Sequence, residues 1–182
     1  MLDEPFGSLD ASARAAVRSE LRTFLRALRL PTLVVTHDAA DALALADRVA
    51  VLENGSLTQT GTPGELLSRP RTRFVADLFG LNYVRAELGA GSGLREARAG
   101  AILFHVLSDE PGGSVSLAFP PSSVALSGER AEGSPQNTLH GVVTEVLPLS
   151  DRVRVVLDCG VLLAADVTHE AAAALGAVPG RP

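Results

Sequence analysis

Two adjacent carboxylates near the start of the chain and one histidine farther along could together support phosphate chemistry. Asp3 and Glu4 follow a short apolar run, and His37 follows a second apolar run at residues 32–36. Carboxylate oxygens suit Mg²⁺, and a neighbouring carboxylate can polarise a water that attacks a phosphate. Each signal alone is weak, because an acidic pair before a turn and a histidine beside a helix start also occur for purely structural reasons.

The residues around His37 predict a buried strand followed by a helix. Residues 32–36 form a short, β-branched apolar run, which indicates a strand covered on both faces, as in a parallel sheet. The alanine- and leucine-rich residues 38–46 predict the helix. Ligands of open α/β sheets lie at the carboxyl ends of strands, so the acidic pair and His37 can reach the same place.

Residues 10–30 predict an amphipathic helix with Asp10 as its N-cap and Pro31 beyond its end. An apolar stripe and a row of arginines recur on different faces of this helix. The stripe contains Val17, Leu21, Phe24, Leu25 and Leu28, and the row contains Arg14, Arg18, Arg22 and Arg26. We interpret the arginine row as a solvated face rather than a partner site.

The rest of the first half predicts a hairpin and two helical segments. Residues 49–52 form a second apolar strand, and Asn54-Gly55 gives a tight turn into residues 56–60. Thr62-Pro63 opens a helix, with threonine as cap and proline in the first turn. A short amphipathic segment, residues 74–79, closes this half.

Together these features resemble the ATPase subunits of ABC transporters over residues 1–81. The resemblance is carried by the Asp3-Glu4 pair, Ser8-Leu9-Asp10, Thr36-His37-Asp38, the Asn54-Gly55 hairpin and Gly61-Thr62-Pro63. It implies an α/β fold, namely part of a P-loop NTPase core, and ATP and Mg²⁺ as cofactors.

The resemblance also implies a role for each matching residue. Asp3 would bind Mg²⁺, Glu4 would be the general base that orients the attacking water, and His37 would contact the γ-phosphate. Ser8 and Asp10 would lie at the nucleotide and touch a second ATPase subunit, because these ATPases work as dimers with nucleotide between the chains. These predicted contacts of Ser8 and Asp10 are implied by the family resemblance and not by the spacing of the residues.

The sequence departs from this family in one major respect. The glycine-rich phosphate loop is absent, and no lysine exists to complete one, because all 16 basic residues are arginine. That loop provides most of the grip on the phosphates. We therefore expect no ATP hydrolysis by this chain alone, and we interpret it as a truncated gene product, a split gene or a fragment whose first strand is cut short.

Residues 82–182 have a different character, with glycine, proline and serine between short alternating runs. This pattern predicts a small all-β, OB-like regulatory barrel after the ATPase part. A weak internal repeat begins at Asn82 and again at Asn137, which suggests half-repeats at residues 82–127 and 135–182. The segment is similar to molybdate-binding barrel modules, and Ser134 and Thr168 are the candidates to hold an oxyanion; connector and helix-cap roles are the alternatives.

Composition narrows the class of protein. The net charge of −5 argues against nucleic-acid binding, and the single cysteine, Cys159, fits a reducing compartment. We interpret the chain as the ATP-binding subunit of an importer of molybdate or a related oxyanion, on the cytoplasmic face of the membrane with permease subunits. The alternatives are a non-catalytic oxyanion-binding or dimerisation module, and an ATPase subunit of a sulfate, sugar, polyamine or iron importer.

Overall fold

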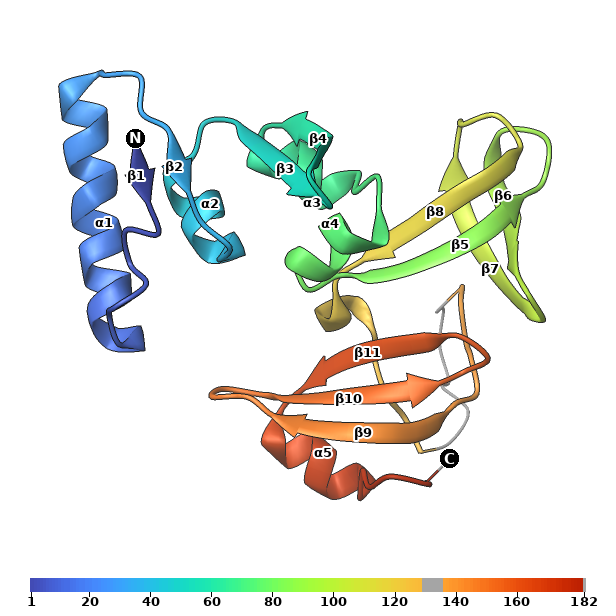
Figure 1. The fold of residues 1–182 in the computed structure, drawn as a ribbon. Helices are drawn as coiled ribbons and strands as arrows, with labels where there is room; N and C mark the ends of the chain where they lie inside the picture. Colours follow the sequence, from blue (N-terminus) through green and yellow to red (C-terminus); the bar gives the residue numbers. More distant parts are fainter. Residues whose placement is uncertain (129–135, 182) are drawn as a thin grey trace. The chain divides into compact units, whose positions relative to one another are not determined.

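A computed structural model describes residues 1–128 and 136–181 of the chain. The chain divides into two compact units, Met1–Phe79 and Gly80–Pro182 (Figure 1). Each unit has its own secondary structure and apolar core, and each is described separately below. Among the described residues, no helix is both long and apolar enough to cross a membrane.

The first unit mixes short strands with helices, as its sequence predicts. Its elements are β1 (Leu2–Asp3), α1 (Ala11–Leu28), β2 (Val34–Val35), α2 (Ala39–Leu45), β3 (Val49–Glu53), β4 (Ser56–Gly61), α3 (Pro63–Ser68) and α4 (Arg73–Leu78). β1 and β2 pair in parallel, and β3 and β4 form an antiparallel hairpin. The described strands of this unit therefore form two separate two-stranded sheets.

The strand predicted at residues 32–36 is shorter and more exposed than the sequence indicates. β2 contains Val34–Val35 only, and the Leu33 and Val35 residues on this segment are 62% and 44% exposed. The expectation of burial on both faces is wrong for this structure. The physical reason is that β2 pairs with β1 alone, so the described residues supply neither a strand on its other edge nor a second covering layer.

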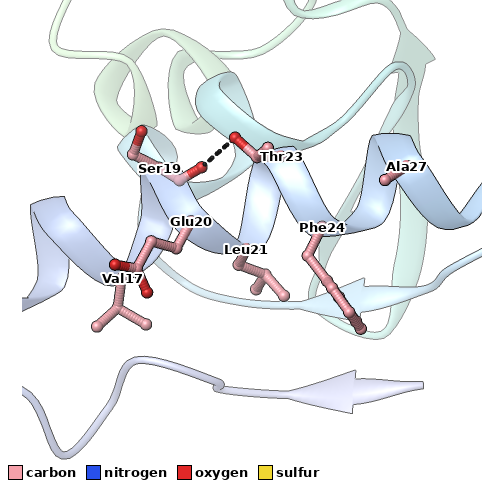
Figure 2. A pocket seen from close by; sticks show the side chains of 7 residues that line it. All are labelled: Val17, Ser19, Glu20, Leu21, Thr23, Phe24 and Ala27. Carbon is pink, nitrogen blue, oxygen red and sulfur yellow. Dashed lines mark hydrogen bonds between the residues drawn. The ribbon is translucent and has the colours of Figure 1, made fainter.

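The apolar stripe of α1 is also largely uncovered. Val17 and Phe24 are 39% and 59% exposed, and a hollow on this helix is lined only by residues of the helix itself. Figure 2 shows the side chains of Val17, Leu21 and Phe24 extending to one side of α1. The helix forms as predicted, but its stripe finds little apolar surface to pack against.

The hairpin and its two helices follow the local sequence signals closely. Asn54 and Gly55 both have positive φ angles, 50° and 76°, as a tight hairpin turn requires. Thr62 and Glu65 form a reciprocal capping box at the start of α3, with proline in the first turn. Val51, Leu66 and Val75 make the small core that joins the hairpin to α3 and α4.

The second unit is built mainly from antiparallel strands. Its elements are β5 (Asn82–Leu88), β6 (Gly93–Ala99), β7 (Ile102–Ser108), β8 (Gly113–Phe119), η1 (Pro121–Ser123), β9 (Val142–Pro148), β10 (Val153–Asp158), β11 (Leu162–Val167) and α5 (His169–Leu175). The described strands form a four-stranded sheet, ordered β7-β6-β5-β8, and a three-stranded sheet, ordered β11-β10-β9. Each sheet lies within one of the two suggested half-repeats, and the expected OB-like barrel takes the form of two sheets rather than one continuous ladder.

Two asparagines connect each half of this unit to the other. Asn82 donates from Nδ2 to the Ala164 carbonyl at 2.9 Å and accepts from the Ala164 N–H at 2.7 Å. Asn137 makes the same pair of hydrogen bonds with the backbone of His105, at 2.9 and 2.7 Å. Ala164 lies on β11 and His105 on β7, which are both edge strands, so each amide takes the place of a neighbouring strand.

One arginine fixes the loops at one end of the four-stranded sheet. Arg95 is 7% exposed and donates to the carbonyl oxygens of Gly89, Gly91, Ser108 and Glu110, at 2.6–3.1 Å. These carbonyls belong to the β5–β6 and β7–β8 connections. The guanidinium therefore satisfies backbone groups that these turns would otherwise leave without partners.

We predict that Asn82→Ala destabilises the second unit by about 2–4 kcal/mol, because the change removes the buried amide of Asn82 and leaves the Ala164 N–H and C=O without their partners. Urea unfolding followed by tyrosine fluorescence measures this change. Tyr83 is the sole tyrosine and is buried in β5, and the chain contains no tryptophan whose emission would mask the tyrosine signal. The exposed neighbour change Gln136→Ala is the control. An unchanged unfolding midpoint in Asn82→Ala would contradict the strand-replacing role of this amide.

Candidate active site

The parallel pairing of β1 and β2 brings the acidic pair and the histidine to the same edge. Leu2 is opposite Val34 and Asp3 is opposite Val35, and the Glu4 N–H donates to the Val35 carbonyl at 2.9 Å. Both strands therefore end at the same level. Glu4 comes directly after β1 and His37 two residues after β2, as the sequence predicts for an open α/β sheet.

Glu4 and His37 are in direct contact. The Glu4 Oε1 atom lies 2.8 Å from His37 Nδ1 and accepts a hydrogen bond from the His37 backbone N–H at 3.1 Å. The hydrogen bond to Glu4 and the charge of this carboxylate raise the pKa of His37 above its ordinary value of 6.5. The imidazole itself is 82% exposed, so it remains open to a ligand.

The backbone at Glu4 has an unusual conformation that suits this contact. Glu4 has a φ of 43°, which is uncommon for a residue with a side chain. The Gly7 N–H donates to the Glu4 carbonyl at 3.0 Å and the Leu9 N–H to the Phe6 carbonyl at 3.1 Å. These bonds form a tight turn, held by the buried ring of Phe6, immediately after the carboxylate.

Asp3, which the sequence predicts as a magnesium ligand, has a free carboxylate within the described part of the chain. Its side chain is exposed and makes no hydrogen bond or ion pair with the rest of the described chain, so both oxygens can accept a ligand. Within the described residues no group of three or more His, Cys, Asp or Glu could hold a metal. A magnesium ion here would therefore take Asp3 as its protein ligand and complete its shell with water and phosphate oxygens, as Mg²⁺ commonly does.

In the loop at residues 8–10, Asp10 has a structural role and the side chain of Ser8 is free to bind a ligand. Asp10 caps α1, because its Oδ1 accepts from the Ala13 N–H at 2.9 Å. The Ser8 hydroxyl is exposed and has no hydrogen-bond partner among the described residues. The Asp10 cap agrees with the helix start expected from the sequence, and the nucleotide and partner contacts of both residues remain predictions.

Two arginines of the predicted row contact the segment that carries His37. Arg14 Nη1 lies 3.0 Å from Asp38 Oδ2, and Arg18 Nε donates to Asp41 Oδ1 at 2.7 Å. The solvated-face interpretation of the row is therefore wrong for Arg14 and Arg18, although Arg22 and Arg26 are exposed. The sequence signal that could have found them is the presence of two carboxylates, Asp38 and Asp41, on the next helix.

These arginines also affect the ionisation of the carboxylates. Partial burial raises the pKa of Asp38, but the hydrogen bond from the Ala40 N–H and the Arg14 guanidinium outweigh it and hold the pKa below the ordinary value. Asp38 is also the N-cap of α2, because its Oδ1 accepts from Ala40 N at 2.7 Å. The residue after His37 is thus an ionised cap bound to α1.

One of the two oxyanion candidates, Thr168, lies in the second unit. Thr168 is the N-cap of α5, and its Oγ1 accepts from the Ala171 N–H at 3.1 Å. The helix-cap role considered for Thr168 is therefore present, while its oxyanion role stays a prediction. Ser134 lies outside the described residues.

Comparison with known proteins gives close relatives over most of the chain. A molybdenum import ATP-binding protein of Mycobacterium tuberculosis is 38% identical over 148 residues, which is 80% of this chain and 40% of the relative. A sulfate/thiosulfate import ATP-binding protein of Chromobacterium violaceum is also 38% identical over 148 residues, 80% of this chain and 39% of the relative. No family model matches the chain.

A third relative imports a different kind of cargo. An Fe(3+) ions import ATP-binding protein of Agrobacterium fabrum is 35% identical over 143 residues, 77% of this chain and 40% of the relative. The chain spans about two fifths of the length of these relatives. Its homologues are thus ATP-binding subunits of importers, and they differ in what they import.

We predict that the pKa of His37 is above 6.5 in the native chain and falls in Glu4→Ala, because that change removes both the hydrogen bond and the negative charge. Since the folded pKa is raised, the pair contributes stability below the unfolded pKa of about 6.5, and this contribution is lost as pH rises through the folded pKa.

An NMR pH titration of the histidine ring signals measures this shift. His169, an exposed residue of the second unit, serves as the internal reference in the same sample. Equal His37 pKa values in the native chain and in Glu4→Ala would show that the contact is not formed in solution.

Proposed function

We propose, from the homology of this chain to ATP-binding subunits of importers, that it forms part of an ATP-hydrolysing subunit of an ABC-type importer. The observation that supports this most directly is the Glu4–His37 contact at the ends of two parallel strands, at 2.8 Å. A carboxylate and an imidazole held together at such an edge can act on one phosphate and its attacking water.

The proposed mechanism assigns a separate task to each residue. Glu4 accepts the proton of the attacking water, and its backbone turn holds the carboxylate where the strand ends. His37 donates a hydrogen bond to the γ-phosphate from its exposed ring and is oriented by Glu4 through Nδ1. Mg²⁺, with Asp3 as its protein ligand, supplies neutralisation of the phosphate charge when bound.

The gripping of the phosphates requires residues that this chain does not contain, since it has neither a phosphate loop nor a lysine. We therefore place the hydrolysis in a complete subunit that includes such a loop. In that assembly Ser8 and Asp10 would face a second ATPase subunit across the nucleotide. The assembly would work with permease subunits at the cytoplasmic face of the membrane.

For the cargo we propose a tetrahedral oxyanion, with molybdate as the first candidate. Support comes from the molybdenum and the sulfate/thiosulfate relatives, which match this chain over the same number of residues at the same identity. Molybdate and sulfate share a tetrahedral dianionic shape. The iron relative matches almost as much of the chain, so an iron importer is the main alternative for the cargo.

We predict that Glu4→Gln in the complete subunit lowers kcat by about 10²–10⁴-fold, because it removes the general base while leaving the shape of the site intact. The nucleotide Kd should stay within about threefold of its original value, since the base acts in the chemical step. Steady-state ATPase assays and equilibrium nucleotide binding measure the two quantities separately.

Glu20→Gln is the matched control. Glu20 is an exposed carboxylate of α1 and has no hydrogen-bond or ion-pair partner among the described residues. This change should leave both kcat and Kd unchanged. If Glu4→Gln retained more than about half of the original kcat, the assignment of Glu4 as the general base would be wrong.

The proposed oxyanion role of Thr168 gives a separate test. Because its hydroxyl oxygen already caps α5, we expect Thr168→Ala to lower the stability of the second unit by about 1 kcal/mol and to leave any molybdate binding unchanged. Calorimetry with molybdate, tungstate and phosphate measures the binding. Selective molybdate binding that disappears in Thr168→Ala would instead show that this hydroxyl holds the oxyanion.

A further inference from the structure

The residues on both sides of His37 are held by side chains from α2 and α1. Thr36 precedes His37 and donates from Oγ1 to Asp41 Oδ2 at 3.2 Å. Asp38 follows it and is bound by Arg14 at 3.0 Å. The turn at residues 36–38 is therefore fixed at each end, while the imidazole between these ends extends into solvent.

Asp41 is the centre of this arrangement. It is 3% exposed, and an unpaired carboxylate at such a position would be strongly unfavourable. Arg18 supplies the compensating charge through Nε at 2.7 Å and through Nη2, and Thr36 supplies a further donor. The Thr36 hydroxyl also accepts from the Asp38 N–H at 3.1 Å, so one network includes both neighbours of His37.

Arg14 connects the same turn to the loop at residues 8–10. Its Nη1 binds Asp38, and its Nη2 reaches the Leu9 carbonyl at 3.5 Å. The Arg14 Nε atom is buried and has no hydrogen-bond partner among the described residues, so Nη1 and Nη2 make the hydrogen bonds of this guanidinium. The helix that begins at Asp10 thus binds the loop before it and the turn that carries His37.

We propose that Arg14 and Arg18 are positioning residues that hold the His37 turn against α1, so that the imidazole meets Glu4. Their importance for hydrolysis rests on the proposed function above, but the positioning itself does not. Among the described residues, neither arginine forms a hydrogen bond or ion pair with the imidazole or with Glu4, and they bind the carboxylates of Asp38 and Asp41.

The test is the ¹⁵N NMR signature of the His37 ring in the 182-residue chain. Glu4→Ala gives the reference signal of His37 without its partner. We expect the His37 Nδ1 resonance in Arg14→Gln and in Arg18→Gln to move toward that reference, because the turn is released. His105, His140 and His169 all lie in the second unit and should not move.

Three further variants separate positioning from general damage. Arg22→Gln removes an exposed arginine of the same row and should leave His37 unchanged. Leu25→Ala lowers the stability of α1 packing without touching the network, so it should not move the His37 signal at temperatures where the unit stays folded. Arg18→Lys should restore part of the native signal, because one ammonium can reach Asp41 but cannot repeat both guanidinium contacts.

The outcomes decide the proposal in either direction. A His37 signal that stays native in both Arg14→Gln and Arg18→Gln would overturn it, as would an equal displacement in Leu25→Ala. If Arg18→Gln unfolds the first unit, Arg14→Gln and Arg18→Lys provide the decision. Since no nucleotide is needed, a failed ATPase prediction for Glu4 would leave this result intact, and the reverse also holds.

Discussion

The parallel register of β1 and β2 is the constraint on which the candidate site depends. A shift of one residue between these strands would turn the side chains of Leu2 and Asp3 each to the face opposite the present one and would separate Glu4 from His37. Only two residue pairs define this register, and they are not buried under a second layer. The register therefore needs support from outside the sheet, and the hydrogen bonds of Glu4 to the Val35 carbonyl and to His37 provide part of it.

Polar contacts from α1 provide the rest of this support. In a typical α/β unit the helix is held by its apolar face, but here Val17, Phe24 and Leu28 are substantially exposed. The side-chain contacts that α1 makes near the site are charged, and charge-assisted hydrogen bonds are shorter and stronger than neutral ones and fix geometry as apolar packing does not. This explains how a precise Glu4–His37 geometry can coexist with a first unit whose apolar surface is largely uncovered.

Local features of the fold could be predicted from the sequence, whereas contacts between distant residues could not. Asn54-Gly55, the Thr62 capping box and the Asp10 cap depend on residues within three positions of each other, so their signals are contained in short stretches. The Arg18–Asp41 pair and the Asn82–Ala164 clamp join residues 23 and 82 positions apart, and no periodicity encodes such pairs. The exposure of β2 could not be predicted from the sequence. A β-branched apolar run indicates a strand that is buried when neighbouring strands and a second layer are present, and it does not indicate whether they are.

The relatives match residues from both units of the chain. A match over 148 residues exceeds the length of either unit, since these cover residues 1–79 and 80–182, so it must include parts of both. Relatives named for molybdenum, sulfate/thiosulfate and iron match to nearly the same extent. The extent of the match therefore does not distinguish one cargo from another. The Thr168 hydroxyl oxygen already accepts the hydrogen bond that caps α5, so this residue is a poor position for a side chain that selects cargo.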